Sequence, residues 1–351
     1  MKPTMTDQPI PDRAGAISSD WLSEALGLRV AECLVEDAHS GTTGRAVLGL
    51  KYWAGDTGPE RLFVKLPPVD SAQQQFVVSS GMGRREAKFY RLIASTIPVR
   101  VPRCYYSDWS DDGERYIMLL EHLADSGCTF RNASTRYSLD YMRLVLKAFA
   151  RLHAGYWQSA RFKSDLRWLK PPLQHDIGRQ LVARALAQHG GSMPDIFSAT
   201  AEIYLSNTDA IHQLWNQGAH TLIHGDVHDG NLFFDVDAPG FLDWAVVARG
   251  PGMRDVGYFL AGTLTSEDQH HHLDLLAYYR QQLLAHGAPA PSLDELLLQY
   301  SWHAVYVWVG ATVTLAMGDA WQPQRYVQRS LERVHSALEQ VDSLGNLSKY
   351  L

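Results

Sequence analysis

The chain has 351 residues, of which 46% are hydrophobic and 20% charged, and its formal net charge is −6. This composition is typical of a globular protein with ample apolar surface to bury, arranged as one large domain or two closely packed lobes. The charges are interspersed, without the long basic run that holds a nucleic-acid backbone, so we expect no nucleic-acid partner.

Cysteine usage and apolar stretches limit the setting of the protein. Three cysteines, Cys33, Cys104 and Cys128, lack the spacing of a zinc site or a disulfide framework. We therefore expect a reducing, cytoplasmic location. Residues 1–16 are polar and predict a flexible lead-in without a signal peptide or anchor. The most apolar stretch, 302–317, is too short to span a membrane and predicts a buried core helix.

Two kinds of periodicity divide the chain. The first third alternates apolar and polar residues and predicts strands, interrupted by one helix over 82–95. These strands are expected over 30–38, 46–53, 61–66, 101–108 and 116–121. From residue 138 onward, apolar residues recur every three or four positions and predict helices. The pattern indicates an α+β protein with a β-rich first part and a helical remainder.

A short β-like segment lies inside the helical part. Strands over 231–235 and 241–244 are predicted on either side of the turn signal Asp237-Ala238-Pro239-Gly240. The predicted organisation is a lead-in over 1–16, an N-terminal lobe over 17–122 and a helical C-terminal lobe over 123–351, which holds a loop over 222–231 and a hairpin over 231–244.

The densest group of polar ligand-type residues is the loop His224-Gly225-Asp226-Val227-His228-Asp229-Gly230-Asn231, followed twelve residues later by Asp243. Phosphoryl transfer needs a carboxylate that orients the attacking hydroxyl and oxygen ligands that hold Mg²⁺ on the nucleotide phosphates. Asp226 matches the first requirement. Asn231 and a strand-borne Asp243 match the second, at the spacing of the general kinase pattern.

A lysine and a glutamate upstream form a second candidate pair. Lys65 interrupts the apolar strand over 61–66. Glu86 falls on the same helical stripe as Phe89, Tyr90 and Ile93, which places a carboxylate on a core-facing surface. Since a buried charge needs a partner, Lys65 is expected to pair with Glu86 and to reach the nucleotide phosphates. An exposed Glu86 among neighbouring basic residues is the alternative.

Two weaker signals complete the predicted nucleotide site. A small-residue loop between two strands could cover phosphates with its backbone amides, and it comprises Gly41, Thr42, Thr43 and Gly44. An ordinary hairpin loop would look the same. The strand over 116–121 leads into the helical part, where the carbonyl of Glu121 and the amide of Leu123 are candidate contacts for an adenine ring.

These motifs together resemble the aminoglycoside phosphotransferase and choline kinase-like superfamily. The resemblance rests on the 224–231 loop, Asp243, the Lys65/Glu86 pair and Leu152-His153-Ala154. Residues 86–90 and 252–260 are similar to the ecdysteroid kinase-like branch.

The resemblance implies a two-lobed protein kinase-like fold that binds ATP, with GTP left open, and Mg²⁺. It implies Asp226 as catalytic base, and Asn231 and Asp243 as metal ligands. His224 precedes a glycine at a tight turn and is expected to orient the loop backbone. The resemblance also implies that Asp255 braces the loop by hydrogen bonds. Only twelve residues separate Asp243 from Asp255, which leaves no room for a long activation segment and disfavours a protein substrate.

We therefore expect a kinase, monomeric or homodimeric, that phosphorylates a hydroxyl group of a small metabolite or natural product. The end of the chain, residues 346–351, lacks the clustered acids that a polycationic aminoglycoside would need, so a fairly apolar acceptor is preferred. Three alternatives stay open: an aminoglycoside phosphotransferase, a nucleotide-binding pseudokinase, and a phosphohydrolase whose metal is held by His224 and His228 with neighbouring aspartates.

Overall fold

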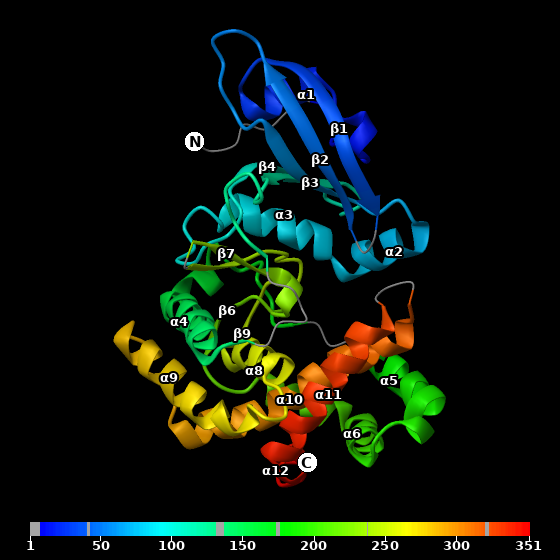
Figure 1. The fold of residues 1–351 in the computed structure, drawn as a ribbon, viewed down its shortest axis with the longest axis vertical. Coiled ribbons are helices and arrows are strands. Elements are labelled where there is room, and N and C mark those ends of the chain that lie inside the picture. The colour runs from blue at the N-terminus through cyan, green and yellow to red at the C-terminus, as the bar shows by residue number, and fades with distance from the viewer. Residues whose placement is uncertain (1–7, 41–42, 131–136, 173–175, 237, 320–322) are drawn as a thin grey trace. The chain divides into compact units, whose positions relative to one another are not determined.

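The computed structural model describes residues 8–40, 43–130, 137–172, 176–236, 238–319 and 323–351. The chain divides into two compact units: unit 1 is residues 1–131 with 231–247, and unit 2 is residues 132–230 with 248–351. Unit 1 is built on a β-sheet and unit 2 mainly on helices (Figure 1), which confirms the predicted α+β class.

Unit 1 contains an antiparallel sheet in the strand order β1-β2-β3-β5-β4 and a separate hairpin of β7 and β8. Its elements are α1 (Ser19–Leu26), β1 (Val30–Ser40), β2 (Gly44–Tyr52), β3 (Arg61–Leu66), α2 (Ser71–Ser80), α3 (Met82–Leu92), β4 (Cys104–Trp109), β5 (Tyr116–Glu121), β7 (Leu232–Asp235) and β8 (Ala238–Phe241).

Helices α1 and α3 pack on different faces of this sheet because side chains alternate along each strand. Val64 of β3 packs with Trp21 of α1 in one apolar core. The next residue, Lys65, points the other way and meets Glu86 of α3. Helix α3 comes very close to β5, since a Cβ atom on Gly83 would lie 2.0 Å from the Tyr116 ring.

The hairpin differs from its prediction. Its strands pair from Leu232 with Phe241 to Asp235 with Ala238, so the predicted second strand over 241–244 is wrong. Pro239 and Gly240 lie in β8 rather than in the turn, because among the described residues the outer edge of β8 makes a single bridge, from Arg100 to Gly240, and a proline is tolerated on such an edge. As a result Asp243 follows the strand and is not part of it.

Three further predictions about unit 1 need correction. The sequence predicted a single helix here, and helices α1 and α2 were missed. Helix α1 is short, and α2 is a Ser- and Gln-rich segment without an apolar stripe. The Asp70 side chain caps the start of α2 by accepting a hydrogen bond from Gln73 N at 2.9 Å. The strand predicted over 101–108 begins only at Cys104. The predicted lobe boundary after residue 122 also differs from the units, because Thr129 and Phe234 exchange backbone hydrogen bonds of 2.9 and 2.8 Å that join the hairpin to unit 1.

Unit 2 is helical apart from the two-stranded sheet of β6 and β9. Its elements are α4 (Leu139–Gly155), α5 (Asp176–His189), α6 (Asp195–Ser206), α7 (Thr208–Trp215), β6 (His220–Ile223), β9 (Ala248–Pro251), α8 (Met253–Thr263), α9 (His272–Ala285), α10 (Leu293–Met317), α11 (Gln324–Gln340) and α12 (Ser343–Ser348).

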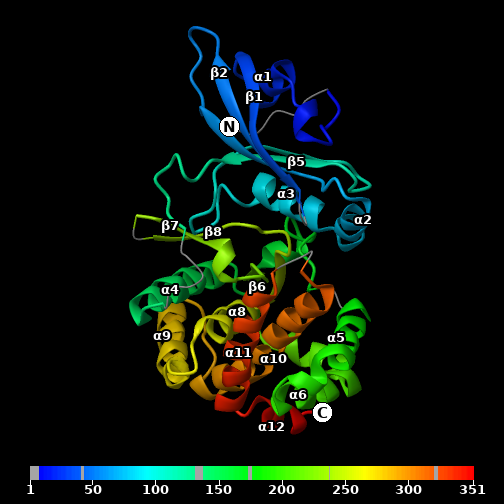
Figure 2. The same cartoon turned by 45° about the vertical axis from the view of Figure 1, so that its right-hand side comes forward.

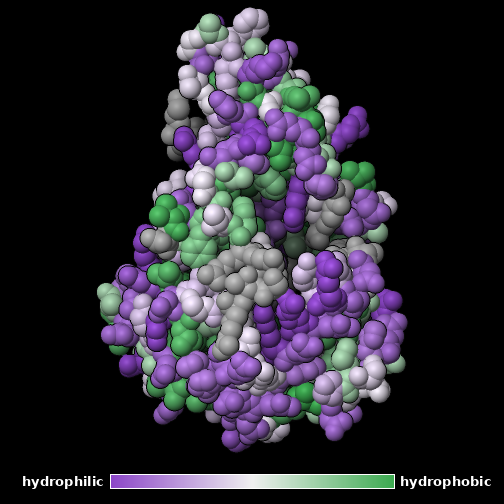
Figure 3. Space-filling model, in the orientation of Figure 1, coloured by the Kyte–Doolittle hydropathy of each residue, from purple (hydrophilic) through white to green (hydrophobic). Residues whose placement is uncertain are grey.

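Helix α10 is the central element of unit 2. It packs against α5, α7, α8, α9, α11 and α12, and many of its residues are buried. Figure 2 shows α10 among the helices of unit 2. The predicted buried core helix over 302–317 is therefore confirmed as the greater part of α10. Hydrophilic residues cover most of the face of unit 2 that Figure 3 shows. Over the described residues, no helix is long and apolar enough to cross a membrane.

A buried histidine in this core predicts that stability falls in acid. Trp308 Nε1 donates a hydrogen bond to His335 Nε2 at 3.2 Å, and burial lowers the pKa of His335 to about 4. Because the unfolded chain takes up this proton near pH 6.5, the contribution is complete above that pH and is lost as the pH falls toward 4. Urea unfolding between pH 7.5 and 4.5 should show a loss of up to about 1.4 kcal/mol per pH unit from this group. His335→Asn should flatten the dependence, and a variant with the wild-type slope would contradict the assignment.

Candidate active site

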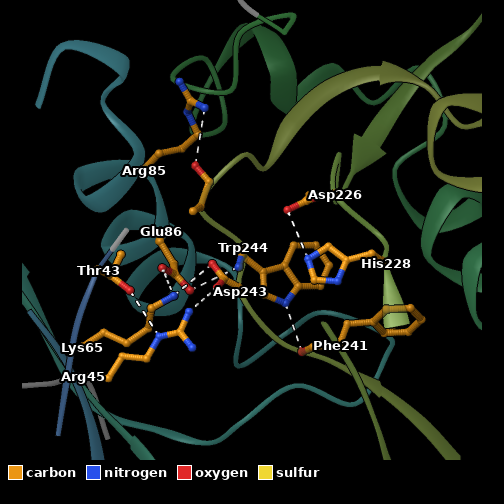
Figure 4. Close-up of polar contacts among 11 residues, drawn as sticks. Thr43, Arg45, Lys65, Arg85, Glu86, Asp226, His228, Phe241, Asp243 and Trp244 are labelled. Atoms are coloured by element: carbon orange, nitrogen blue, oxygen red, sulfur yellow. Dashed lines mark hydrogen bonds and ion pairs between the residues drawn. The ribbon is translucent and has the colours of Figure 1, made fainter. Parts of the chain in front are cut away.

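The first group of candidate residues surrounds Lys65 in unit 1. Lys65 Nζ lies 2.6 Å from Glu86 Oε2 and 2.9 Å from Asp243 Oδ1 (Figure 4). Burial opposes the charge on Lys65, but the Asp243 and Glu86 carboxylates outweigh it and raise the pKa of the lysine. Burial raises the pKa of Glu86 to about 7, although Lys65 acts in the opposite direction. The predicted Lys65/Glu86 pair is confirmed, and the exposed alternative for Glu86 is wrong, since its side chain is fully buried.

Asp243 is held in a strained backbone conformation directly after β8. Its φ is +62°, which is uncommon for a residue with a side chain. The next residue fixes it there: Trp244 N donates to Glu86 Oε1 at 3.2 Å, and the Trp244 ring stacks on Phe89 with centroids 4.1 Å apart. Glu86 therefore anchors both Lys65 and the segment that carries Asp243, which holds the lysine and the aspartate in a defined geometry.

An arginine that the sequence analysis missed joins this group. Arg45 of β2 pairs in register with Lys65 of β3, and its Nη2 lies 3.6 Å from Asp243 Oδ2. Arg45 Nε donates a hydrogen bond of 3.4 Å to Thr43 Oγ1. Alternation on β2 and the position opposite Lys65 were the signals that could have identified Arg45.

The small-residue loop is described only in part. Gly41 and Thr42 lie outside the described residues, Thr43 is buried, and Gly44 begins β2. A Cβ atom on Gly44 would lie 2.5 Å from the Pro67 carbonyl oxygen, so this position requires glycine for packing. The role of this loop in phosphate binding stays a prediction.

Asn231 lies at the base of the hairpin in unit 1. It is buried, and its carbonyl oxygen accepts a hydrogen bond from Leu242 N at 3.0 Å, which places it across the ladder from the residue before Asp243. The two predicted metal ligands thus come from neighbouring ends of one hairpin.

The predicted adenine contacts lie in another part of unit 1. The Glu121 carboxylate accepts hydrogen bonds from Arg100 at 2.7 and 2.9 Å, and these lower the pKa of Glu121 against the effect of its burial. The Glu121 carboxylate is thus engaged by Arg100 within the protein. Backbone contacts of Glu121 and Leu123 with an adenine ring stay a prediction.

The second group of candidate residues is the loop after β6 in unit 2. The fully buried His224 ring accepts a hydrogen bond from Asp226 N at Nδ1, at 3.3 Å. His228 Nε2 lies 3.8 Å from Asp226 Oδ2, and its Nδ1 accepts a hydrogen bond from Gly230 N at 3.0 Å (Figure 4). Both imidazoles therefore orient the loop backbone, as expected for His224.

Asp255 braces this loop from the first turn of α8. The carboxylate is fully buried and accepts hydrogen bonds from His224 N at 2.7 Å and from Gly225 N at 2.8 Å. His153 Nε2 lies 3.3 Å from the same carboxylate. Gly225 has φ +88°, a conformation that favours glycine and turns its amide toward Asp255. The bracing role that the resemblance implies for Asp255 matches this arrangement.

Two tyrosines that the sequence analysis left without a role also contact the loop. Burial and the neighbouring Asp226 carboxylate, to which the hydroxyl hydrogen-bonds, hold the pKa of Tyr258 well above its usual range. Tyr306 donates a hydrogen bond to the Gly225 carbonyl oxygen at 3.0 Å, and the Arg254 guanidinium lies 4.3 Å from the Tyr306 ring centroid. Tyr258 is 32 residues from Asp226 in the sequence, and Tyr306 is 81 residues from Gly225. Local sequence patterns do not predict contacts over such separations.

The donor set of unit 1 suits Mg²⁺ better than a transition metal. Within the described residues, no group of three or more His, Cys, Asp and Glu side chains could hold a metal ion. Mg²⁺ is usually bound by one or two protein oxygens together with substrate phosphates and waters, and Asn231 and Asp243 could supply these oxygens. The His224 ring is fully buried and its Nδ1 is already an acceptor for a backbone amide, which argues against the hydrolase alternative.

Comparison with known proteins identifies one matching family. The model of the "Phosphotransferase enzyme family" matches residues 46–296 of the chain. Among curated proteins, no sequence matches. The sequence comparison thus points to a family without giving a characterised relative.

Solved structures show the same fold at low sequence identity. The chain is similar to choline kinase from Cryptosporidium parvum Iowa II, with 12% identity, TM-score 0.53, and 96% of this chain and 94% of that chain covered. It is also similar to a putative aminoglycoside phosphotransferase from Ralstonia eutropha, with 14% identity, TM-score 0.53, and 92% and 97% covered. A third is the AMP-bound spectinomycin phosphotransferase, with 13% identity, TM-score 0.51, and 95% and 99% covered. At these identities the likeness establishes the kinase-like fold alone.

Proposed function

The chain belongs to the phosphotransferase enzyme family, and from this premise we propose that it transfers the γ-phosphate of ATP to a hydroxyl group of a small metabolite or natural product. The observation that carries the proposal is the ion-pair cluster of the buried Lys65 and Glu86 with the partly exposed Asp243, because buried charges with shifted pKa values that meet a specific charge partner are concentrated at functional sites. Membership of the ecdysteroid kinase-like branch stays a prediction.

In this proposal, unit 1 binds the nucleotide. Lys65, held in place by Glu86, neutralises phosphate oxygens, and Arg45 adds a second cation beside it. Asn231 and Asp243 would hold Mg²⁺, which supplies charge neutralisation on the phosphates when bound. Lys65 contacts both the Glu86 and the Asp243 carboxylates, which places its ammonium group beside the proposed metal ligand.

Asp226 orients the acceptor hydroxyl and takes its proton. The acceptor oxygen attacks the γ-phosphorus in line, the bond from that phosphorus to the bridging oxygen breaks, and ADP leaves with the bonding electrons. Asp255 accepts hydrogen bonds from the His224 and Gly225 amides and His224 accepts one from the Asp226 amide, so the backbone leading into Asp226 is fixed, while Tyr258 hydrogen-bonds to the Asp226 carboxylate. By holding Asp226 in this geometry before the acceptor binds, the loop raises the rate of phosphoryl transfer.

Asp243→Ala tests the nucleotide part of the proposal. Loss of the carboxylate should weaken Mg·ADP binding by about 10-fold or more, since one charge-assisted contact contributes about 1.5–3 kcal/mol. The measurement is calorimetric titration with Mg·ADP, with the same titration repeated without Mg²⁺. Asp235→Asn is a matched control, because Asp235 lies on the same hairpin and pairs with Arg100 at 2.6 Å. Equal affinities for all three proteins would contradict the metal-binding role of Asp243.

ADP release against a panel of hydroxylated compounds tests the transfer itself. Acceptor-dependent release would support the kinase, and turnover of an aminoglycoside would favour the antibiotic phosphotransferase alternative. Nucleotide binding without transfer to any acceptor or to water would favour the pseudokinase alternative.

A further inference from the structure

A cavity in unit 2 lies against the loop that carries Asp226. It has a volume of about 330 Å³ and is bounded by residues 227–230, by α8, by α10 and by α11. Tyr258 of α8 lines this cavity and also hydrogen-bonds to the Asp226 carboxylate. A molecule that places a hydroxyl group beside Tyr258 would therefore reach the proposed catalytic base.

One residue of the cavity wall, Gly310, lies in the interior of α10, which continues to Met317. Glycine is less stable than alanine in a helix interior, because it loses more conformational freedom on folding and has no side chain to pack. The backbone of Gly310 is helical, a conformation that every residue with a side chain adopts readily. The backbone therefore gives no reason for glycine at this position.

Packing gives no reason for Gly310 either. Apart from the backbone of its own helix, the nearest described atom to a Cβ atom on Gly310 would be the Tyr258 hydroxyl oxygen, at 3.9 Å. Gly257 of α8 is a contrast, since its Cβ atom would lie 2.7 Å from His303 Cβ of α10. Gly257 thus allows the two helices to pack closely, whereas the missing side chain of Gly310 leaves open space beside Tyr258.

The wall around this space is apolar near the Tyr258 hydroxyl. Val227, Val307 and Ala311 are among the lining residues. The carbonyl oxygen of Gly310 already accepts a hydrogen bond from Thr314 Oγ1 at 2.9 Å, so the backbone here presents little unsatisfied polarity. Such a surface suits a hydrocarbon group that is attached to a hydroxyl.

We propose that Gly310 determines which acceptors fit: a ring or branched carbon that carries the reacting hydroxyl packs against Gly310, in the space that a side chain would fill. The hydroxyl then lies beside Tyr258 and faces Asp226. A larger residue at position 310 excludes such an acceptor by overlap, although the helix itself becomes more stable without the glycine. This inference rests on the proposed function, because it assigns the acceptor of the same reaction to the cyclic and branched alcohols.

Thermal unfolding of two alanine variants tests whether packing requires Gly310. Gly310→Ala should raise the midpoint of unfolding by about 1–4 °C, because alanine restricts the unfolded chain and fits the helix. Gly257→Ala should lower the midpoint, because its new Cβ atom meets His303. An unchanged or lower midpoint in Gly310→Ala would overturn the inference, since glycine would then serve the packing of α10.

The binding test uses the full chain saturated with Mg·ADP and cyclohexanol as the probe, in a titration followed by ligand-observed NMR. We expect saturable binding that weakens at least about 10-fold in Gly310→Val, because small changes in the volume of an apolar pocket alter affinity by about 10–200-fold. Gly310→Ala should weaken binding less. Gly191→Val is the matched control, because Gly191 is not among the described lining residues and its Cβ atom would meet no described atom within 4 Å.

Two results in this titration would overturn the inference: absent cyclohexanol binding, and equal affinities in wild type and Gly310→Val. In turnover, Gly310→Val should raise KM for cyclic and branched alcohols more than for straight-chain primary alcohols. If both KM values rise equally, the inference fails and the kinase function stands. If Mg·ADP does not bind while cyclohexanol binding still depends on position 310, the proposed kinase function fails and the cavity stands as a ligand site.

Discussion

Replacing Asp226 by Asn is expected to lower kcat by about 10³-fold, within the range of about 10²–10⁴ that general-base catalysis contributes. The amide keeps the size of the side chain and can still accept a hydrogen bond from Tyr258, whose hydroxyl contacts the carboxylate in the native protein. It cannot take the proton of the acceptor hydroxyl. Binding of Mg·ATP should be nearly unchanged, because in the proposed mechanism Asp226 contacts the acceptor hydroxyl, whereas Lys65, Asn231 and Asp243 bind the phosphates and the metal.

The measurement for Asp226→Asn is single-turnover transfer with the best acceptor from the panel, together with calorimetric titration of Mg·ADP. His228→Asn is a useful companion, since His228 Nε2 lies 3.8 Å from Asp226 Oδ2 but its ring also accepts a hydrogen bond from Gly230 N. It should lower kcat far less than Asp226→Asn. Near-normal turnover in Asp226→Asn would show that the assigned base is wrong.

Asp255→Ala should destabilise unit 2 and abolish activity together. The substitution leaves the amides of His224 and Gly225 buried without their acceptor and removes the carboxylate that lies beside His153 Nε2. Each buried donor left without a partner costs about 1–3 kcal/mol, so we expect a loss of about 3–5 kcal/mol in the free energy of unfolding. With Gly225 no longer fixed, the loop that carries Asp226 loses its geometry.

Urea unfolding followed by far-UV circular dichroism measures the effect of Asp255→Ala. Asp294→Ala is the matched control, because Asp294 also lies in the first turn of a helix, α10, but is exposed. A carboxylate in that position contributes only about 0.3–1 kcal/mol through the helix dipole. A stability loss in Asp255→Ala no larger than in Asp294→Ala would contradict the bracing role.

Local periodicity was sufficient to predict several residues of the site. Alternation along β3 separates Lys65 from the core of Val64, and the 3.6-residue helical period places Glu86 among Phe89 and Tyr90. Two buried charges of opposite sign in one unit then have a strong reason to pair. The spacing from Asp226 to Asn231 is likewise a property of one short loop, so it could be identified without any tertiary structure.

Contacts between residues far apart in the chain could not be predicted from local patterns. Tyr306 of α10 hydrogen-bonds to Gly225, which lies 81 residues earlier in the sequence. Arg333 of α11 lies close to Asp229 of the same loop, and α10 and α11 pack against each other. Local sequence patterns also failed to predict where β8 ends. Proline and glycine favour a turn in isolation, but pairing with β7 and the bridge to Arg100 stabilise them as a strand and leave Asp243 past its end. Local propensities are weak compared with burial and hydrogen bonding, and those are fixed only when distant segments pack together.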